Sequence, residues 1–272
     1  SAGAPDAGTT WWVDGFLDYS AAYCDVVSVH SYPYWPNENE NELLSKTTLW
    51  KTWIPKIRDS IRAHMGARAD SIEIAVTEWN SGDEKSMTAR LANGIFAAEF
   101  LAQMIVTGVD QAHIWDIYTQ KVDLGGGHGV LDPGGDDGRP YAERATYWVL
   151  SLFRNHFGIT LCEAGSDRDP LAVYASVDGD GKKYLMVINK NSTSAYDADI
   201  SWGKSDLTKY RASYLTFGRK EYSWNDEKYR AELNTGPTRT EDAEPVVGAL
   251  RHVFPAFSVT SIELSRGSGD SK

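Results

Sequence analysis

The hydrophobic pattern of this chain changes at Gly158, and that change constrains the fold more than any other feature. Before Gly158, short β-branched runs alternate with longer segments whose apolar residues recur at helical spacing. After it, short runs alternate in polarity and nothing helical intervenes. The sequence therefore predicts an α/β part over residues 1–158, an antiparallel β-sandwich over 159–265 and a disordered tail at 266–272.

The first part contains three predicted strands separated by helices. Helical spacing is found at 10–23, at 43–66, at 87–106 and at 141–157. Pro55 should bend the second helix or mark its true start. The strands are DVVSVHSY at 25–32, SIEIAVTEW at 71–79 and VDQAHIWDIY at 109–118, and a Gly-rich loop follows at 124–138. Helical connections of this length predict parallel strands that are buried on both faces.

The second part has the marks of an all-β domain. Alternating runs occur at 171–177, 183–190, 197–202, 211–217 and 257–264. Asp-Gly-Asp-Gly at 178–181 lies between two of them and predicts a hairpin turn.

Charge and short motifs narrow the classes of function. A net charge of −11 argues against nucleic acid and against an anionic membrane surface as partners. No apolar run approaches the roughly 20 residues of a spanning helix, and SAGAPDAGTT lacks the features of a signal peptide. The localisation stays open: secreted or periplasmic if an N-terminal segment is missing, otherwise cytoplasmic.

The sequence predicts no metal site and no cofactor. Cys24 and Cys162 have no metal-ligand spacing and are expected to be buried thiols. GGGHG at 125–129 lacks the Lys and Ser/Thr of a phosphate-binding loop, so a flexible active-site loop is the better interpretation.

Chemistry in parallel α/β sheets collects where the strands end. The first strand ends in HSYPYW, the second in VTEWN and the third in HIWDIY. These ends bring one carboxylate, several hydrogen-bonding groups and many aromatic rings to one edge of the sheet. An acidic residue at this place is either exposed to solvent or has a functional role, because burying an unpaired carboxylate is energetically costly.

HSYPYW, VTEWN and HIWDIY, in this order and separated by helices, resemble the ends of strands six, seven and eight in clan A glycoside hydrolases. The resemblance is nearest to the β-xylosidases, α-L-arabinofuranosidases and endoglucanases of families 39, 51 and 44. It implies a retaining enzyme on a (β/α)8 barrel, of which this chain holds strands six to eight, followed by a β-sandwich. Residues 129–158 also resemble the segment that leads such barrels into their sandwich.

The resemblance implies a role for each strand-end residue. Glu78 would be the nucleophile, and Tyr32 or His30 would donate a hydrogen bond to it. Trp115 would form the floor under the sugar. Further substrate contacts would come from four rings and one amide: Trp35, Tyr34, Trp79, Tyr118 and Asn80, with a weaker claim for Asp116.

Each of these residues also has a plainer interpretation. Glu78 taken without its neighbours is more simply an exposed acid or a salt-bridge partner. His30 could be a structural histidine, and Trp115 could belong to a packed barrel interior.

The second carboxylate of a retaining glycosidase is missing from the pattern. The two carboxyl groups must lie about 5 Å apart, and the resemblance places the acid/base on strand four, outside this sequence. Three parallel strands cannot close a barrel and leave an open edge. We therefore expect a fragment of a longer product, a second chain that completes the barrel, or self-association. Glu38, Glu40 and Glu42 are local acids, but a charged run before a helix suits the helix N-terminus better.

The expected function is thus a retaining O-glycosyl hydrolase that acts on a plant-type polysaccharide or oligosaccharide, of xylosidase, arabinofuranosidase or endoglucanase type. The alternative is a catalytically incompetent carbohydrate-binding protein or fragment.

Overall fold

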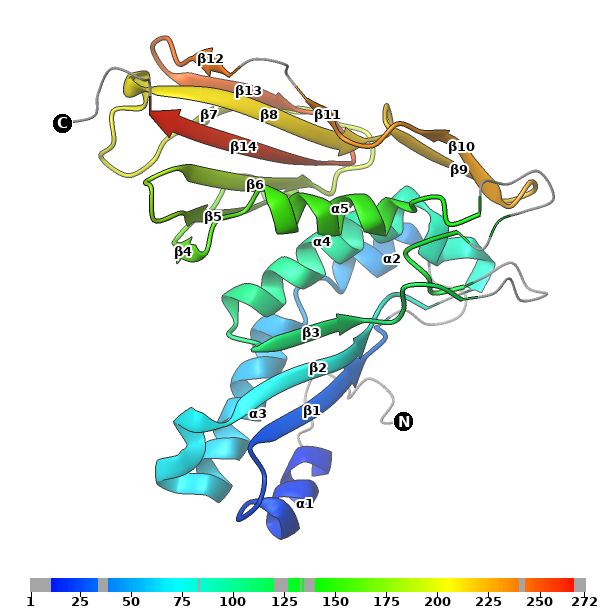
Figure 1. Ribbon diagram of the computed structural model, residues 1–272, viewed down its shortest axis with the longest axis vertical. Helices are drawn as coiled ribbons and strands as arrows, with labels where there is room; N and C mark the ends of the chain where they lie inside the picture. Colours follow the sequence, from blue (N-terminus) through cyan, green and yellow to red (C-terminus); the bar gives the residue numbers. More distant parts are fainter. Residues whose placement is uncertain are drawn as a thin grey trace.

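The computed structural model describes residues 11–33, 39–82, 84–119, 127–132, 134, 140–239 and 243–266 of the chain. It confirms the predicted fold class: three parallel strands with their helices form part of a barrel, and antiparallel sheets follow in a sandwich-like arrangement (Figure 1).

The barrel part has the sheet order β1-β2-β3, and both neighbouring pairs are parallel. The strands are β1 (Val26–Ser31), β2 (Glu73–Trp79) and β3 (Gln111–Ile114). The helices are α1 (Trp11–Ser20), α2 (Glu40–Ser45), α3 (Trp50–Met65), α4 (Leu91–Val106) and α5 (Ala145–Asn155), with 3-10 turns η1 (Gly66–Ser71) and η2 (Glu84–Ala89). The strand order agrees with the order in which the three strand-end motifs follow one another in the sequence.

Two helix predictions need correction. The segment predicted as one helix at 43–66 is two helices, α2 and α3, and Thr47 is buried between them, with its hydroxyl oxygen 2.9 Å from the carbonyl oxygen of Leu44. Pro55 lies inside α3 and does not mark its start. The helix predicted from residue 87 begins at Leu91, and the preceding residues form the 3-10 turn η2.

The sandwich part is antiparallel throughout its strand pairs. One sheet has the order β11-β8-β14-β6-β5-β4, with β12 also on β8, while β13 pairs with β7 and β10 with β9. The strands are β4 (Thr160–Cys162), β5 (Leu171–Val177), β6 (Lys183–Asn189), β7 (Tyr196–Ile200), β8 (Tyr210–Gly218), β9 (Tyr222–Asn225), β10 (Arg230–Asn234), β11 (Thr238–Arg239), β12 (Glu244–Pro245), β13 (Leu250–Phe254) and β14 (Ser258–Arg266), with the 3-10 turn η3 (Leu207–Lys209) before β8. The predicted turn at 178–181 joins β5 to β6, and Gly181 donates its N–H to the carbonyl of Asp178 at 3.0 Å.

Helices α4 and α5 lie between the barrel strands and the sandwich (Figure 1). The apolar core is continuous from Phe96 and Phe100 of α4 to Phe217 and Val259 of the sandwich. The predicted division at residue 158 falls between α5 and β4, but it stays a prediction because both sides share this core. Of the predicted tail, Arg266 is the last residue of β14, and 267–272 lie outside the described residues.

Two polar contacts reinforce this junction. The carboxylate of Glu99, buried in α4, accepts a hydrogen bond from Lys190 Nζ, which follows β6, at 2.7 Å. The hydroxyl of Tyr222 in β9 donates to the carbonyl of Ala89 at 2.7 Å. Over the residues described, no helix is both long and apolar enough to cross a membrane.

Candidate active site

A β-bulge near the end of β2 decides which way Glu78 points. Val76 and Glu78 pair with consecutive residues of β1, so Thr77 is an extra residue on β2. Val76 is fully buried in the core beside the helices, and strict alternation would place Glu78 on that same side. The bulge shifts the alternation by one residue, so Trp79 enters the core and Glu78 faces away from it.

One oxygen of the Glu78 carboxylate is held and the other is free. The Tyr32 hydroxyl donates to Oε2 at 2.8 Å, and His30 Nδ1 lies 3.5 Å from the same oxygen. Among the residues that the structure describes, Oε1 has no hydrogen-bond partner. A carboxylate fixed through one oxygen, with the other open to approach, has the geometry that a nucleophile requires.

The environment of Tyr32 keeps its hydroxyl protonated. Burial raises the pKa of Tyr32 most, and the hydrogen bond to Glu78 and the negative charges of Glu78 and Asp116 raise it further. The ring of His128 packs edge-on against the Tyr32 ring, with centroids 5.7 Å apart. Tyr32 is therefore a neutral, oriented hydrogen-bond donor to Glu78.

Trp115 and Tyr118 provide exposed aromatic surface beyond the end of β3. The Trp115 side chain is 47% exposed, while its backbone N–H donates to the carbonyl of Trp79 at 3.1 Å. Tyr118 is also exposed, and its ring packs on Tyr141 with centroids 5.3 Å apart. Exposed aromatic faces of this kind can stack on a ligand, and the interpretation of Trp115 as part of a packed barrel interior stays open, because the described strands form only part of a barrel.

Two of the predicted substrate contacts do not lie in the site. Trp79 is 1% exposed and packs against Phe100 of α4, with ring centroids 5.8 Å apart. Asn80 is 0% exposed, and its amide donates to the carbonyls of Trp115 and His128. The bulge at Thr77 is the physical reason for Trp79, because it reverses the faces that simple alternation predicts.

The remaining predicted contacts are Tyr34 and Trp35, and they fall outside the described residues. Glu38 also falls outside the described residues, and Glu40 and Glu42 behave as the helix-terminus interpretation predicts. Glu42 accepts a hydrogen bond from the backbone N–H of Asn39 at 2.8 Å in a capping box, and Glu40 lies 3.7 Å from Arg90.

Sequence reasoning missed or undervalued two neighbours of Tyr32. Asp116 had only a weaker claim in the sequence, but its negative charge raises the pKa of Tyr32, and its carboxylate accepts a hydrogen bond from the Thr119 hydroxyl at 2.6 Å. His128 belongs to the GGGHG stretch at 125–129, for which an active-site loop was the better interpretation, but that pattern did not single out the histidine. Its contact with Tyr32 is a tertiary contact between residues far apart in the sequence.

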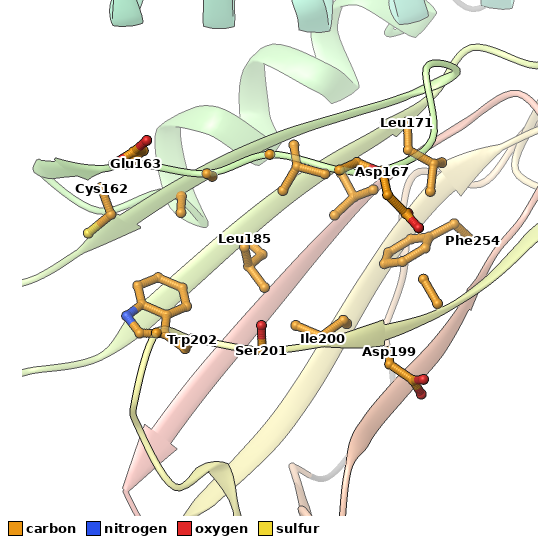
Figure 2. A pocket seen from close by; sticks show the side chains of 18 residues that line it. Cys162, Glu163, Asp167, Leu171, Leu185, Asp199, Ile200, Ser201, Trp202 and Phe254 are labelled. Carbon is orange, nitrogen blue, oxygen red and sulfur yellow. The ribbon is translucent and has the colours of Figure 1, made fainter.

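A pocket of about 360 Å³ lies elsewhere, in the sandwich (Figure 2). Aliphatic side chains such as Leu185 and Ile200 line it, together with Phe254 and Trp202, and no strand-end residue of the barrel part contributes. The free thiol of Cys162 also borders it. Within the described ranges, no group of three or more His, Cys, Asp or Glu could hold a metal ion. The candidate chemistry therefore stays at Glu78.

The partial barrel and the sandwich that follows it have a fold shared with parts of solved clan A glycoside hydrolase structures of families 51 and 44. Among solved structures, the chain is similar to a family 51 α-L-arabinofuranosidase from Thermotoga petrophila RKU-1, with 20% identity, a TM-score of 0.73, and coverage of 97% of this chain and 56% of that one. A family 44 xyloglucanase from Paenibacillus polymyxa matches with 18% identity, a TM-score of 0.65, and coverage of 96% and 52%. A family 51 arabinofuranosidase from Xanthomonas axonopodis pv. citri matches with 13% identity, a TM-score of 0.65, and coverage of 93% and 55%.

No protein-family model matches the sequence, and a search of curated proteins gave no match. The chain spans about half the length of the solved structures it resembles. At these identities the likeness establishes the fold, and it confirms the resemblance to families 51 and 44 at that level.

Proposed function

We propose that this chain is the nucleophile-bearing half of a retaining O-glycosyl hydrolase that acts on plant-type polysaccharide or oligosaccharide. The observation that carries the proposal is the Glu78 carboxylate, which stands at the end of a parallel strand with one oxygen held by Tyr32 and the other without a hydrogen-bond partner among the described residues. The exposed Trp115 ring at the end of the adjacent strand supports a sugar site there. The solved structures named above are arabinofuranosidases and a xyloglucanase, so substrates of those kinds are the first to test.

In the proposed reaction, Glu78 Oε1 attacks the anomeric carbon as the bond to the leaving oxygen breaks, giving a glycosyl-enzyme ester. The Tyr32 hydrogen bond stays on Oε2 and fixes the direction of attack. Water then attacks the same carbon and releases the sugar with its original configuration. His30, 3.5 Å from Oε2, adds positive charge beside the carboxylate whenever its ring is protonated.

The acid/base carboxylate is proposed to come from the polypeptide that completes the barrel, either a preceding segment or a second chain. The exposed rings of Trp12, Phe16, Tyr19 and Tyr23 lie on or just after α1, which precedes the edge strand β1. Exposed rings of this kind are what a docking half-barrel would cover.

The nucleophile can be tested without the missing acid. Dinitrophenyl 2-deoxy-2-fluoro glycosides have a leaving group that departs without protonation, so the 272-residue chain itself should form the ester. α-L-Arabinofuranosyl, β-D-xylosyl and β-D-glucosyl reagents would be incubated with the chain, followed by intact-mass measurement and peptide mapping. We expect one adduct on Glu78 with at least one reagent and none in Glu78→Gln. An adduct on another carboxylate would remove Glu78 from the proposal.

The alternative is a carbohydrate-binding protein that does not cut its ligand, and the exposed Trp115 ring is equally compatible with it. Titration of the chain with xylo-, arabino- and xyloglucan oligosaccharides, followed through the tryptophan fluorescence, separates the two. Saturable binding without any covalent adduct, in the chain and in its complex with the barrel-completing polypeptide, favours the binding protein. Hydrolysis by that complex, lost in Glu78→Gln, favours the glycosidase.

A further inference from the structure

The side chain of Asn80 is fully buried and all of its hydrogen-bonding capacity is used. It lies two residues after Glu78, at a strand end where side chains usually reach solvent. Its amide nitrogen donates to the carbonyl of Trp115 at 2.7 Å and to that of His128 at 3.0 Å. Its oxygen accepts from the N–H of Ser81 at 2.8 Å and from Asn93 Nδ2 at 3.1 Å. Two donors and two acceptors are thus matched one to one.

The two carbonyls that Asn80 holds belong to two segments near the end of β2: Trp115 donates its N–H to the carbonyl of Trp79, and His128 packs against Tyr32. Trp115 follows β3 and presents the exposed ring beside the site. His128 lies in the 127–132 segment and packs its ring against Tyr32, which in turn donates to Glu78. The Asn80 side chain, at the end of the strand that carries Glu78, therefore connects the backbone of Trp115 with that of His128, whose ring packs against Tyr32.

We propose that Asn80 is a positioning residue, whose amide fixes Trp115 and His128 relative to Glu78. The proposal rests on the proposed function for its catalytic meaning, while the positioning itself is a property of the fold. Asn80 touches no reacting atom and acts through the backbones of the two segments that it joins.

The surroundings make an uncharged amide necessary at this place. Asn93 Nδ2 also lies within hydrogen-bond distance of the Thr88 carbonyl, at 3.2 Å, and of Thr146 Oγ1, at 2.9 Å. Residues of α4 and α5 therefore hold Asn93, which in turn contacts the Asn80 side-chain oxygen. Arg144 donates to the Gly129 carbonyl at 3.2 Å and holds the same segment from its other side. An aspartate at position 80 would turn both donors into acceptors facing two carbonyl oxygens.

The test uses the 272-residue chain and does not require activity. Asn80→Asp keeps the shape and removes both donors, and Asn80→Ser removes the amide without adding charge, in case the aspartate variant fails to fold. Gln103→Leu is the control, because Gln103 is equally buried in α4 but bonds to Tyr174 on the sandwich side. The readouts are the Trp115 indole and His128 ring resonances in selectively labelled protein, with circular dichroism as the check of folding.

We expect the Trp115 and His128 resonances to shift or broaden in both Asn80 variants and to stay in place in Gln103→Leu. Unchanged resonances in a folded Asn80 variant would overturn the proposal, and so would equal changes in the control. In the completed glycosidase, Asn80→Ser should lower kcat by about tenfold to a hundredfold with little change in KM, since a displacement of about 1 Å can cost that much. If the wild-type complex is inactive while the resonances behave as expected, the proposed function fails and the positioning role stands.

Discussion

Helices α1 and α4 belong to the same half-barrel but are covered to very different extents. In α4 nearly every side chain is buried, polar ones such as Asn93 and Glu99 included, because the helix lies between the barrel strands and the sandwich. Over residues 12–20 of α1, Val13 and Leu17 are buried, while Trp12 and Phe16 stack on each other at the surface. The side chains of α4, next to the sandwich, are almost all buried, whereas several large side chains of α1 are exposed.

The difference shows where apolar surface is buried within the described part of the chain and where it is exposed. Because α4 is covered on both sides, nearly all of its apolar surface is already buried within the chain. The aromatic residues of α1 keep theirs, and they precede the strand whose outer edge is unpaired. Substitutions on the two faces of α1, and at the junction made by α4, should therefore have effects of different kinds.

The largest effect is expected on the buried face of α1. Leu17 is 0% exposed, and Leu17→Ala should lower the free energy of unfolding by about 3 kcal/mol through lost burial and a residual cavity. Tyr19 is 88% exposed on the same helix, and Tyr19→Ser should change stability by no more than about 0.5 kcal/mol. Urea unfolding followed by circular dichroism measures both.

The same pair of variants sharpens the interpretation of the open edge. If the aromatic face of α1 is a docking surface, Tyr19→Ser should weaken self-association or capture of the barrel-completing polypeptide, measured by light scattering. Leu17→Ala should leave that association unchanged at temperatures where it is folded. The reverse outcome, in which Tyr19→Ser destabilises the isolated chain by as much as Leu17→Ala, contradicts the comparison.

The next effect concerns the junction between α4 and the sandwich. Lys190→Met leaves the buried Glu99 carboxylate without its cation, although the hydroxyl of Thr47 still donates to it at 2.5 Å. We expect a loss of about 2 kcal/mol, below the 3–5 kcal/mol typical of fully buried pairs because Lys190 is partly exposed.

The matched control is Lys228→Met, which breaks the exposed pair of Lys228 with Glu232 and should cost less than about 0.5 kcal/mol. Equal losses in the two variants would show that the junction contributes no more than the surface does. Differential scanning calorimetry of both proteins at one pH makes the comparison.

The fold and the place of Glu78 at a strand end could be predicted from the sequence because both depend on local pattern. A β-branched run that ends in Thr-Glu-Trp-Asn marks a buried strand and its end, and helical spacing on either side makes the strand parallel. The hydrogen bond expected from Tyr32 to Glu78 is present for the same reason, since neighbouring parallel strands end at one edge.

The placement of Trp79 and Asn80 could not be predicted, because it depends on pairing. The bulge at Thr77 is visible only in the register between β1 and β2, and a shift of one residue moves a side chain to the other face. The contact of His128 with Tyr32 could not be predicted for another reason: His128 lies in a segment without periodic pattern that is far from Tyr32 in the sequence. Sequence pattern identifies the elements, whereas tertiary pairing decides which side chains the elements present.

The smallest effect is a pH dependence at the contact between α5 and the sandwich. The hydrogen bond with His156 lowers the pKa of Glu263, burial opposes that shift, and the charges of His156, Arg239 and Lys182 add to the lowering. A carboxyl whose pKa is lower in the folded state stabilises the protein above its unfolded pKa, near 4.5, and this stabilisation is lost as the pH falls through the folded value. The free energy of unfolding should therefore drop on acidification below about pH 4.5, and less steeply in Glu263→Gln.

Urea titrations at pH 7, 5, 4 and 3 measure the slope, and Asp59→Asn, at the exposed pair with Arg62, should keep the wild-type slope. Glu263 joins β14 to His156, the residue that follows α5. A variant slope equal to that of the wild type would mean that this ionic contact adds nothing to the stability that the shared apolar core gives to the covered side of the half-barrel.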